Sequence, residues 1–274
     1  MSDFTIELNV AKKAAKSAAQ IIRKFQKDSN FSVDYKGKND LVTEADVKAE
    51  EAILSVIKKE FPEDHILAEE SSVEQVMPEG RTWLIDPIDG TTNFTHGFPV
   101  YCVSIGLWED REPKMGLVLE VAGNECFTAI KNMGAYLNGN PISVSKADNP
   151  ENALVGTGFP YNDLSLMDHY LEFFRMLMCN IQGVRRPGAA SYDLCCVACG
   201  RFEGFYEYAL NPWDVGAGGL IVQEAGGKVT DWSGGNDWLF GKRIIAGNPG
   251  VHAFLLDEIA TYFEMDEIKA RSEK

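Results

Sequence analysis

One stretch of twelve residues, from Trp83 to Phe94, constrains this chain more than any other. It begins with an apolar run that predicts a buried strand, and Asp86 and Asp89 follow before a Gly-Thr-Thr turn. Carboxylates at the end of a buried strand can hold hard divalent cations, and backbone N–H groups can bind a phosphate where a helix begins. This order predicts metal ions and a phosphate side by side.

Pro87 lies between the two aspartates. Its φ angle is fixed and it has no N–H to give to a sheet, so we expect the chain to turn there. The turn can leave the Ile88 carbonyl pointing inward as another oxygen ligand. An isolated Asp-x-x-Asp-Gly is also typical of an Asx-rich turn that closes a strand, so the motif alone leaves both interpretations open.

Three further segments each place acidic side chains beside an apolar run. They are His65–Ser71, a short strand that ends in Glu69 and Glu70; Leu41–Asp46, which starts a helix; and Asn211–Gly219, which starts another helix at Asp214. Taken singly, Asp46 or Asp214 would be a helix-start carboxylate that interacts with the helix dipole. Four such acidic segments in one chain favour a metal site.

These motifs, in this order, resemble those of the inositol monophosphatase family of magnesium-dependent, lithium-sensitive phosphatases. The resemblance covers nearly the whole chain and rests on Asp40–Asp46, Glu69–Ser71, Trp83–Thr92, Trp213–Asp214 and Glu224–Gly227. It implies a mixed αβ fold, a layered αβαβα sandwich of the inositol monophosphatase and fructose-1,6-bisphosphatase type. It also implies a homodimer.

The resemblance further implies a set of metal ligands. One ion would be bound by Glu69, Asp86 and the Ile88 carbonyl, and a second by Asp86, Asp89 and Asp214. Glu69 would also share a weakly held third ion through water.

For catalysis, the resemblance implies that Thr91, hydrogen-bonded to Asp46, orients the attacking water, with Glu69 as the third catalytic residue. The Gly90 and Thr91 amides would hold the phosphate. The residues expected to contact substrate are Asp89, Gly90, Thr91, Ala190, Glu207 and Asp214. Many relatives carry serine where this chain has Ala189, which leaves the sugar preference open.

The chemistry supports these roles independently. Phosphate monoesters hydrolyse extremely slowly unaided, so a site must neutralise charge, align a water and stabilise the leaving alkoxide. Two divalent cations about 3.5–4 Å apart can meet all three needs. A ligand set made only of oxygen atoms favours Mg²⁺ over zinc, because zinc normally takes imidazole or thiolate ligands. We expect two or three Mg²⁺ ions per site, and Mn²⁺ could substitute for them. Of the four histidines, we expect only His96 to approach the site.

The composition favours a cytoplasmic enzyme with a small phosphorylated polyol or sugar as its substrate. The 26 basic and 41 acidic residues give a formal net charge of −15, which disfavours nucleic acid or an anionic membrane as a partner. The N-terminal segment lacks a signal-type apolar block, and no apolar run reaches membrane-spanning length. The Cys196-Val197-Ala198-Cys199 sequence is flanked by apolar residues, so we interpret its thiols as small core residues.

A polar segment, Lys146–Asn152, predicts the boundary between two tightly joined halves. Residues 1–146 would carry most metal ligands, and residues 147–274 would carry Asp214 and the specificity residues. The expected helices are Phe4–Lys27, Glu44–Glu60, Ser165–Cys179, Ser191–Cys199, Pro212–Ala225 and Pro249–Ile268. The expected strands are His65–Ala68, Thr82–Ile85, Tyr101–Trp108, Lys114–Val121, Glu125–Ile130, Pro141–Ser145, Ala153–Gly158, Ile181–Arg186, Phe202–Tyr208, Lys228–Asp231 and Ile244–Ala246.

Several alternatives stay open at this point. Asp89-Gly90-Thr91 also resembles part of the haloacid dehalogenase motif, but Pro87 occupies the position of the nucleophilic aspartate of that class. A regulatory binding protein on the same fold is the non-enzymatic alternative. Among substrates, inositol monophosphate is favoured over fructose 1,6-bisphosphate, adenosine 3′,5′-bisphosphate and histidinol phosphate by the chain length and by Glu207. Lys36 and Lys38 are expected in a mobile loop that approaches the metals.

Overall fold

The computed structural model describes residues 4–28, 33–37, 40–72, 76–159, 161 and 163–263. Its helices are α1 (Thr5–Asp28), α2 (Glu44–Glu60), α3 (Thr91–Thr95), α4 (Met167–Asn180), α5 (Ala190–Ala198), α6 (Pro212–Glu224) and α7 (Pro249–Tyr262), with a 3₁₀ turn at Pro150–Asn152. Within these residues, no helix is long and apolar enough to cross a membrane.

Two mixed sheets form the frame of the molecule. The larger has the order β3-β4-β5-β6-β7-β8-β9 and the smaller has the order β11-β10-β12-β14-β13. The larger consists of β3 (His65–Ala68), β4 (Arg81–Asp89), β5 (Cys102–Glu109), β6 (Glu112–Glu120), β7 (Glu125–Ile130), β8 (Ala135–Leu137) and β9 (Asn140–Ile142). The smaller consists of β10 (Leu154–Thr157), β11 (Gly183–Arg185), β12 (Gly204–Tyr208), β13 (Lys228–Thr230) and β14 (Arg243–Gly247), and a separate two-stranded ribbon pairs β1 (Val33–Gly37) with β2 (Asp40–Thr43).

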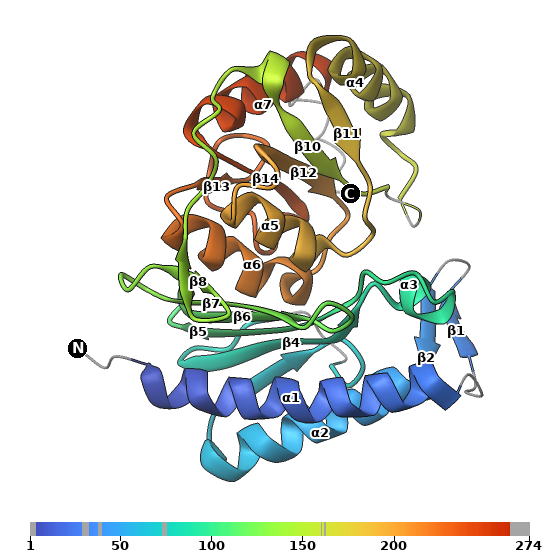
Figure 1. The fold of residues 1–274 in the computed structure, drawn as a ribbon, viewed down its shortest axis with the longest axis vertical. Coiled ribbons are helices and arrows are strands. Elements are labelled where there is room, and N and C mark those ends of the chain that lie inside the picture. The colour runs from blue at the N-terminus through green and yellow to red at the C-terminus, as the bar shows by residue number, and fades with distance from the viewer. Residues whose placement is uncertain are drawn as a thin grey trace.

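The helices and sheets alternate in five layers, as Figure 1 shows. Helices α1 and α2 cover the outer face of the larger sheet, α5 and α6 lie between the two sheets, and α4 and α7 cover the smaller sheet. One apolar cluster lies between the larger sheet and α1 and α2, a second lies between the smaller sheet and α4 and α7, and a third surrounds the central helices and contacts both sheets. The expected αβαβα sandwich is confirmed.

Helix α1 packs through a face made largely of alanine. Its buried apolar residues are Val10, Ala11, Ala14, Ala15, Ala18, Ala19 and Ile22. They recur with the helical period, and their small side chains allow the helix to lie close to α2 and to strands β5 and β6. The opposite face of α1 is left to solvent.

Helix α6 approaches the larger sheet closely enough for backbone contact. A Cβ atom at Gly116 of β6 would lie 2.6 Å from the Ala217 carbonyl oxygen, and one at Gly106 of β5 would lie 3.2 Å from the Ala217 nitrogen. On the helix itself, a Cβ atom at Gly216 would lie 2.4 Å from a methyl of Leu84. The small residues after Asp214 thus pack directly against the sheet, and this close packing holds α6 in place.

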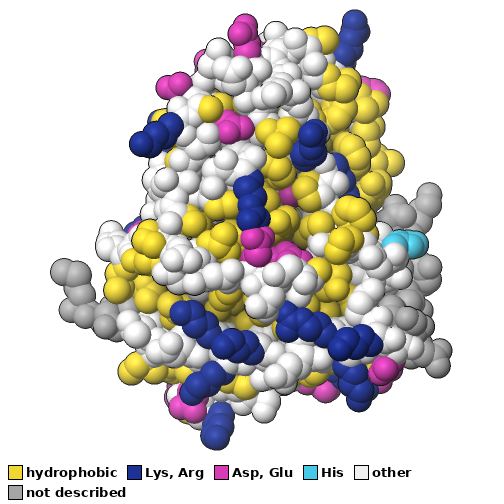
Figure 2. Space-filling model, viewed as in Figure 1, with side chains coloured by type: hydrophobic (Ala, Val, Ile, Leu, Met, Phe, Trp, Pro, Cys, Tyr) yellow, Lys and Arg dark blue, Asp and Glu magenta, His cyan; other side chains and the backbone are white. Residues whose placement is uncertain are grey.

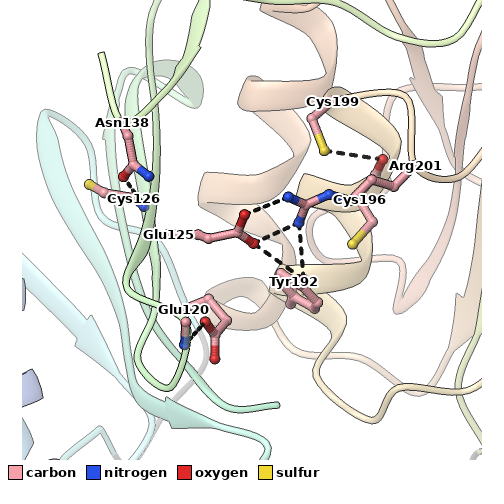
Figure 3. A network of polar contacts seen from close by, with 9 residues as sticks. Glu120, Glu125, Cys126, Asn138, Tyr192, Cys196, Cys199 and Arg201 are labelled. Atoms are coloured by element: carbon pink, nitrogen blue, oxygen red, sulfur yellow. Dashed lines mark hydrogen bonds and ion pairs between the residues drawn. The ribbon is translucent and has the colours of Figure 1, made fainter. Parts of the chain in front are cut away.

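A polar contact joins the larger sheet to the central helices (Figure 3). Arg201, just after α5, donates hydrogen bonds to both carboxylate oxygens of Glu125 on β7 and to the hydroxyl of Tyr192 on α5. Nearby, the Cys199 thiol donates to the Cys196 carbonyl at 3.7 Å, and all six cysteines are free thiols. This agrees with a structural role for the Cys-x-x-Cys pair.

Most elements lie where the sequence predicts them, but some bounds were wrong. Strand β4 continues past Ile85 to Asp89, and the last helix ends at Tyr262 instead of Ile268. The strands β1, β2 and β8 were not predicted. The division of the chain at residue 146 stays a prediction, and α5 and α6 of the second half pack on strands of the first.

We expect Gly116→Ala to destabilise the protein by about 1–3 kcal/mol, because the new methyl group would collide with the α6 backbone. Thermal unfolding would measure this. Gly183→Ala is the matched control, since a Cβ there would meet only side-chain atoms at 3.3 Å and beyond. An equal loss in both variants would contradict the backbone contact.

Candidate active site

Four carboxylates converge where the larger sheet meets the central helices. Glu69 follows β3, Asp86 and Asp89 are on the end of β4, and Asp214 is in the first turn of α6. Strands β3 and β4 are parallel, and the Glu69 N–H donates to the Ile85 carbonyl at 3.1 Å, so the two strand ends are adjacent. The charges of Glu69, Asp89 and Asp214 all raise the pKa of Asp86.

A bulge in β4 brings its two aspartates together. Asp86 pairs with Ser104 and Asp89 with Cys102, so three steps along β4 match two along β5. In a regular strand, side chains three residues apart point to opposite faces. The extra residue in β4 shifts this alternation by one position, so the two aspartate side chains can point to the same face. Pro87, which has no N–H to donate, lies inside the bulge.

Burial and mutual repulsion oppose ionisation of these carboxyl groups. Desolvation is the largest cause for each of Asp86, Asp89 and Asp214, and it raises all three pKa values. Neighbouring carboxylates raise the pKa of Asp86 and Asp214 well above the ordinary value. Hydrogen bonds from Ser191 act in the other direction on Asp89.

The donor set fits a hard divalent cation. One oxygen of each aspartate is already positioned: Asp86 Oδ1 accepts from the Ile88 N–H, Asp89 Oδ2 from Ser191, and Asp214 Oδ2 from the Asn211 N–H. In the described part of the chain, no group of three or more acidic, histidine or cysteine side chains could hold a metal ion in its present conformation. A side-chain hydrogen bond joins Asp86 to Glu69, so two predicted ligands contact one another directly. Clustered, buried carboxylates of this kind are stabilised by cations bound through oxygen.

Thr91 and Asp46 form the expected hydrogen bond. The Thr91 hydroxyl lies 3.0 Å from Asp46 Oδ1 and 3.0 Å from the Ile88 carbonyl, and it can donate its one proton to either. Asp46 is fully buried in the first turn of α2, where its carboxylate also accepts from the backbone N–H and hydroxyl of Thr43. This capping box fixes the orientation of Asp46.

Gly90 makes the turn into α3 possible. Its φ of +94° is in the left-handed region, and a Cβ atom would lie 2.9 Å from the Val100 carbonyl. Glycine is therefore required for both reasons. The first N–H groups of α3 have no acceptor within the helix and lie next to Asp89 in the chain, which suits them to bind a phosphate.

Helix α5 supplies a partner for Asp89 that sequence reasoning missed. The backbone N–H and the hydroxyl of Ser191 donate to Asp89 Oδ2 at 2.7 and 2.5 Å. The expected contact residue Ala190 is the neighbouring residue in the same helical turn, and Ala189 occupies the N-cap without a side-chain hydrogen bond. A serine in the first turn of a helix was the only sequence signal for this contact.

Glu207 on β12 is partly buried, and its carboxyl group lies close enough to Asp89 for the two charges to interact. Burial, as the largest cause, raises its pKa to about 8, with Asp89 adding to the effect and Arg186 opposing it. A Cβ atom at Gly158 would lie 1.8 Å from Glu207 Oε1, so the carboxylate occupies the space that this glycine leaves open. An exposed, solvated Glu207 is thereby ruled out.

Asp193 is a buried carboxyl group that the sequence analysis did not identify. It is 1% exposed, and its Oδ1 has no hydrogen-bond partner among the described residues. Burial raises its pKa well above the ordinary value, and the charges of Glu207 and Asp89 add to that effect. The guanidinium of Arg186 opposes it from a position over the rings of Phe159 and Tyr161.

Other expected residues do not join this group. His96 is exposed at the end of α3. Lys36 lies in strand β1 and not in a loop, so that part of the prediction was wrong. Lys38 and the side chain of Lys36 lie outside the described residues, and their approach to the metals stays a prediction.

Comparisons with known proteins agree on one family. The inositol monophosphatase family matches residues 6–264. The Nus factor SuhB of Pseudomonas aeruginosa is 42% identical over 257 residues, which cover 92% of this chain and 95% of that protein. The inositol monophosphatase of Dictyostelium discoideum is 37% identical over 92% of this chain and 94% of its own length. The structure of inositol monophosphatase from Anabaena has a TM-score of 0.85 at 36% identity, covering 95% of this chain and 97% of that chain.

The metal-free protein should lose stability as the pH rises above 3.8, the ordinary pKa of an aspartate side chain. The folded-state pKa values of Asp86 and Asp214 are raised, so their contribution is fully present below the ordinary pKa and is lost as the pH passes through the raised values. Mg²⁺ should restore the melting temperature at high pH, because it binds only the folded state.

Thermal unfolding of Asp86→Asn and of the exposed control Asp257→Asn would test this. We expect Asp86→Asn to have a smaller pH dependence and a smaller Mg²⁺ effect, and Asp257→Asn to follow the wild type. A Mg²⁺ effect that persists in full in Asp86→Asn would place the ion elsewhere.

Proposed function

The chain belongs to the inositol monophosphatase family, and we propose that it is a metal-dependent phosphate monoester hydrolase that acts on an inositol monophosphate. The observation that carries the proposal is the convergence of four carboxylates, from Glu69, Asp86, Asp89 and Asp214, beside the Thr91–Asp46 hydrogen bond and the first turn of α3. Metal ligands, a water-orienting pair and a phosphate-binding turn are the parts that this reaction requires.

We propose Mg²⁺ as the native cation, two or three ions per site, with Mn²⁺ as a substitute. Glu69, Asp86 and the Ile88 carbonyl would hold one ion, and Asp86, Asp89 and Asp214 another. When bound, the ions neutralise phosphate charge and activate water as a nucleophile. Lithium sensitivity is part of the same proposal, through exchange at the Asp86–Asp89–Asp214 position.

The protein's own groups perform the remaining steps. Asp46 accepts the Thr91 proton, which leaves a lone pair of the Thr91 oxygen to accept a hydrogen bond from the attacking water and so to orient it. The N–H groups of Gly90 and Thr91 hold the phosphate oxygens as they gain charge. Direct attack by water is favoured over a phosphoenzyme, since Pro87 stands where a nucleophilic aspartate would be needed.

The alcohol part of the substrate would contact Ala190 and Glu207. Glu207 is held between Gly158 and the acidic cluster, and a carboxylate there can accept hydrogen bonds from polyol hydroxyls. The identity to a Dictyostelium protein named inositol monophosphatase supports this choice. Fructose 1,6-bisphosphate, adenosine 3′,5′-bisphosphate and histidinol phosphate are the alternatives within the same chemistry.

A regulatory binding role is the second candidate. It is favoured by the 42% identity to a protein named Nus factor SuhB. The presence of every acidic residue in the site supports catalysis, and the two roles are compatible in one chain. A cytoplasmic location remains a prediction.

A homodimer is also proposed. Three large apolar side chains on and just before α4 are more than half exposed: Leu164, Leu171 and Met178. Figure 2 shows hydrophobic side chains gathered along the upper right edge, where Figure 1 draws α4. Contiguous exposed apolar surface of this kind is typical of a protein interface.

The direct test is hydrolysis of inositol 1-phosphate with Mg²⁺, followed by phosphate release. Asp89→Asn should reduce kcat by about 100-fold or more while the protein stays folded, because the lost ligand and charge act on the transition state. Excess chelator should abolish turnover. Full activity in chelator would rule out metal-dependent chemistry.

At a pH above its raised pKa of about 8, where Glu207 is ionised, we expect Glu207→Ala to lower kcat/KM for inositol monophosphate by about one to two decades, the value of a hydrogen bond to a charged group. An aryl phosphate, which has no such hydroxyl, should be hydrolysed nearly as before. Glu203→Ala is unsuitable as a control because Glu203 accepts a hydrogen bond from the Leu154 N–H, so Glu51→Ala, at an exposed position of α2, serves instead. Equal losses on both substrates would assign Glu207 to the catalytic machinery or the fold.

A further inference from the structure

The exposed face of α1 carries six cations, and the one exposed acidic residue of the helix is Asp28 at its C-terminal end. The cations are Lys12, Lys13, Lys16, Arg23, Lys24 and Lys27, and we call this set the basic face of α1. Between Leu8 and Lys27 the helix has no acidic residue, and its one earlier acid, Glu7, is buried and paired with Arg81. Figure 2 shows the corresponding row of dark blue side chains across the lower part of the molecule, where Figure 1 draws α1.

These charges are not neutralised by their surroundings. In the described part of the chain, none of the five lysines forms an ion pair with a carboxylate. Arg23 donates to the Val121 carbonyl and to Asn124 Oδ1, both of which are uncharged. In a protein with a net charge of −15, an unpaired row of cations on one helix needs a separate explanation.

The row has the geometry of a linear anion-binding surface. Lys12 and Lys16 are one helical turn apart, as are Arg23 and Lys27, and the row from Lys12 to Lys27 is about 22 Å long. Uncharged polar residues, Asn9, Ser17 and Gln20, complete the outer face. Side chains of these types are the ones that contact phosphate oxygens in nucleic-acid complexes.

The composition of the face separates the candidate partners. From Asn9 to Lys27 its fully exposed positions include no aromatic or large aliphatic residue; Ile21 and Phe25 are half-buried, and the exposed Ile6 lies at the helix end. Membrane-bound helices bury such residues, protein interfaces are built around them, and single-stranded nucleic acids stack on them. Interfaces with duplex nucleic acid are instead polar and strongly positive.

We propose that the basic face of α1 binds the phosphate backbone of a double-stranded nucleic acid without reading its sequence. Because α1 lies flat on α2 and the sheet, the helix would lie along the backbone and not enter a groove. The protein's net charge of −15 repels a nucleic acid while the two molecules are far apart. At physiological salt, however, screening acts over about 8 Å, so the local cations decide the contact.

The test is fluorescence anisotropy of a labelled 20-base-pair DNA duplex with the full-length protein. Chelator is present throughout, so metal ions in the active site cannot recruit phosphate. We expect a dissociation constant of about 10⁻⁴–10⁻⁶ M that weakens steeply with added salt. The variant Lys12→Gln/Lys16→Gln/Lys27→Gln should bind about tenfold more weakly or worse, with the slope of log affinity against log salt reduced by about 2 to 3.

The matched control, Lys58→Gln/Lys146→Gln/Lys228→Gln, removes the same charge from exposed positions elsewhere and should bind as the wild type does. Thermal unfolding checks that both variants are folded. Absence of salt-dependent binding, or an equal loss in the control, would overturn the proposal. Tighter binding of a polyglutamate peptide than of the duplex at the same salt would also overturn it, in favour of an acidic protein partner.

Discussion

The mutual repulsion of buried carboxylates is the constraint on which the rest of this structure depends. Asp86, Asp89 and Asp214 carry raised pKa values because burial and neighbouring anions both oppose their ionisation. Such a cluster is unfavourable unless protons or cations occupy it. The fold therefore has to hold the groups together by other means, and the energy for this comes from apolar packing on both sides of the site.

Helix α6 shows how that packing reaches the site. Its glycines and Ala217 allow backbone contact with β5 and β6, so the helix cannot shift without losing apolar contacts in the central layer. Asp214 lies in the first turn of the same helix, where a capping box with Asn211 fixes its side chain. One element thus transfers the rigidity of the sheet packing to a carboxylate of the cluster. Pro212 at the first helical position sets where the helix begins.

The sequence predicted the acidic residues of the site well, because strands and helix starts carry local signals, and the family resemblance predicted the layer order. Asp86 follows an apolar run, and Asp46 and Asp214 follow capping residues. It did not predict contacts that depend on tertiary structure. The bulge at Pro87, the Ser191 hydroxyl on Asp89, the orphaned Asp193 and the space above Gly158 that admits Glu207 all arise where distant segments meet. Strand β8 was missed because three residues are too few to show a period.

A crystal structure with Mn²⁺ and inorganic phosphate, measured at a wavelength that reveals manganese by anomalous scattering, tests the central claim most directly. We expect one peak contacted by Glu69, Asp86 and the Ile88 carbonyl, a second contacted by Asp86, Asp89 and Asp214, and phosphate density at the first turn of α3. Carboxylates that keep their present hydrogen bonds with no anomalous peak among them would contradict the claim.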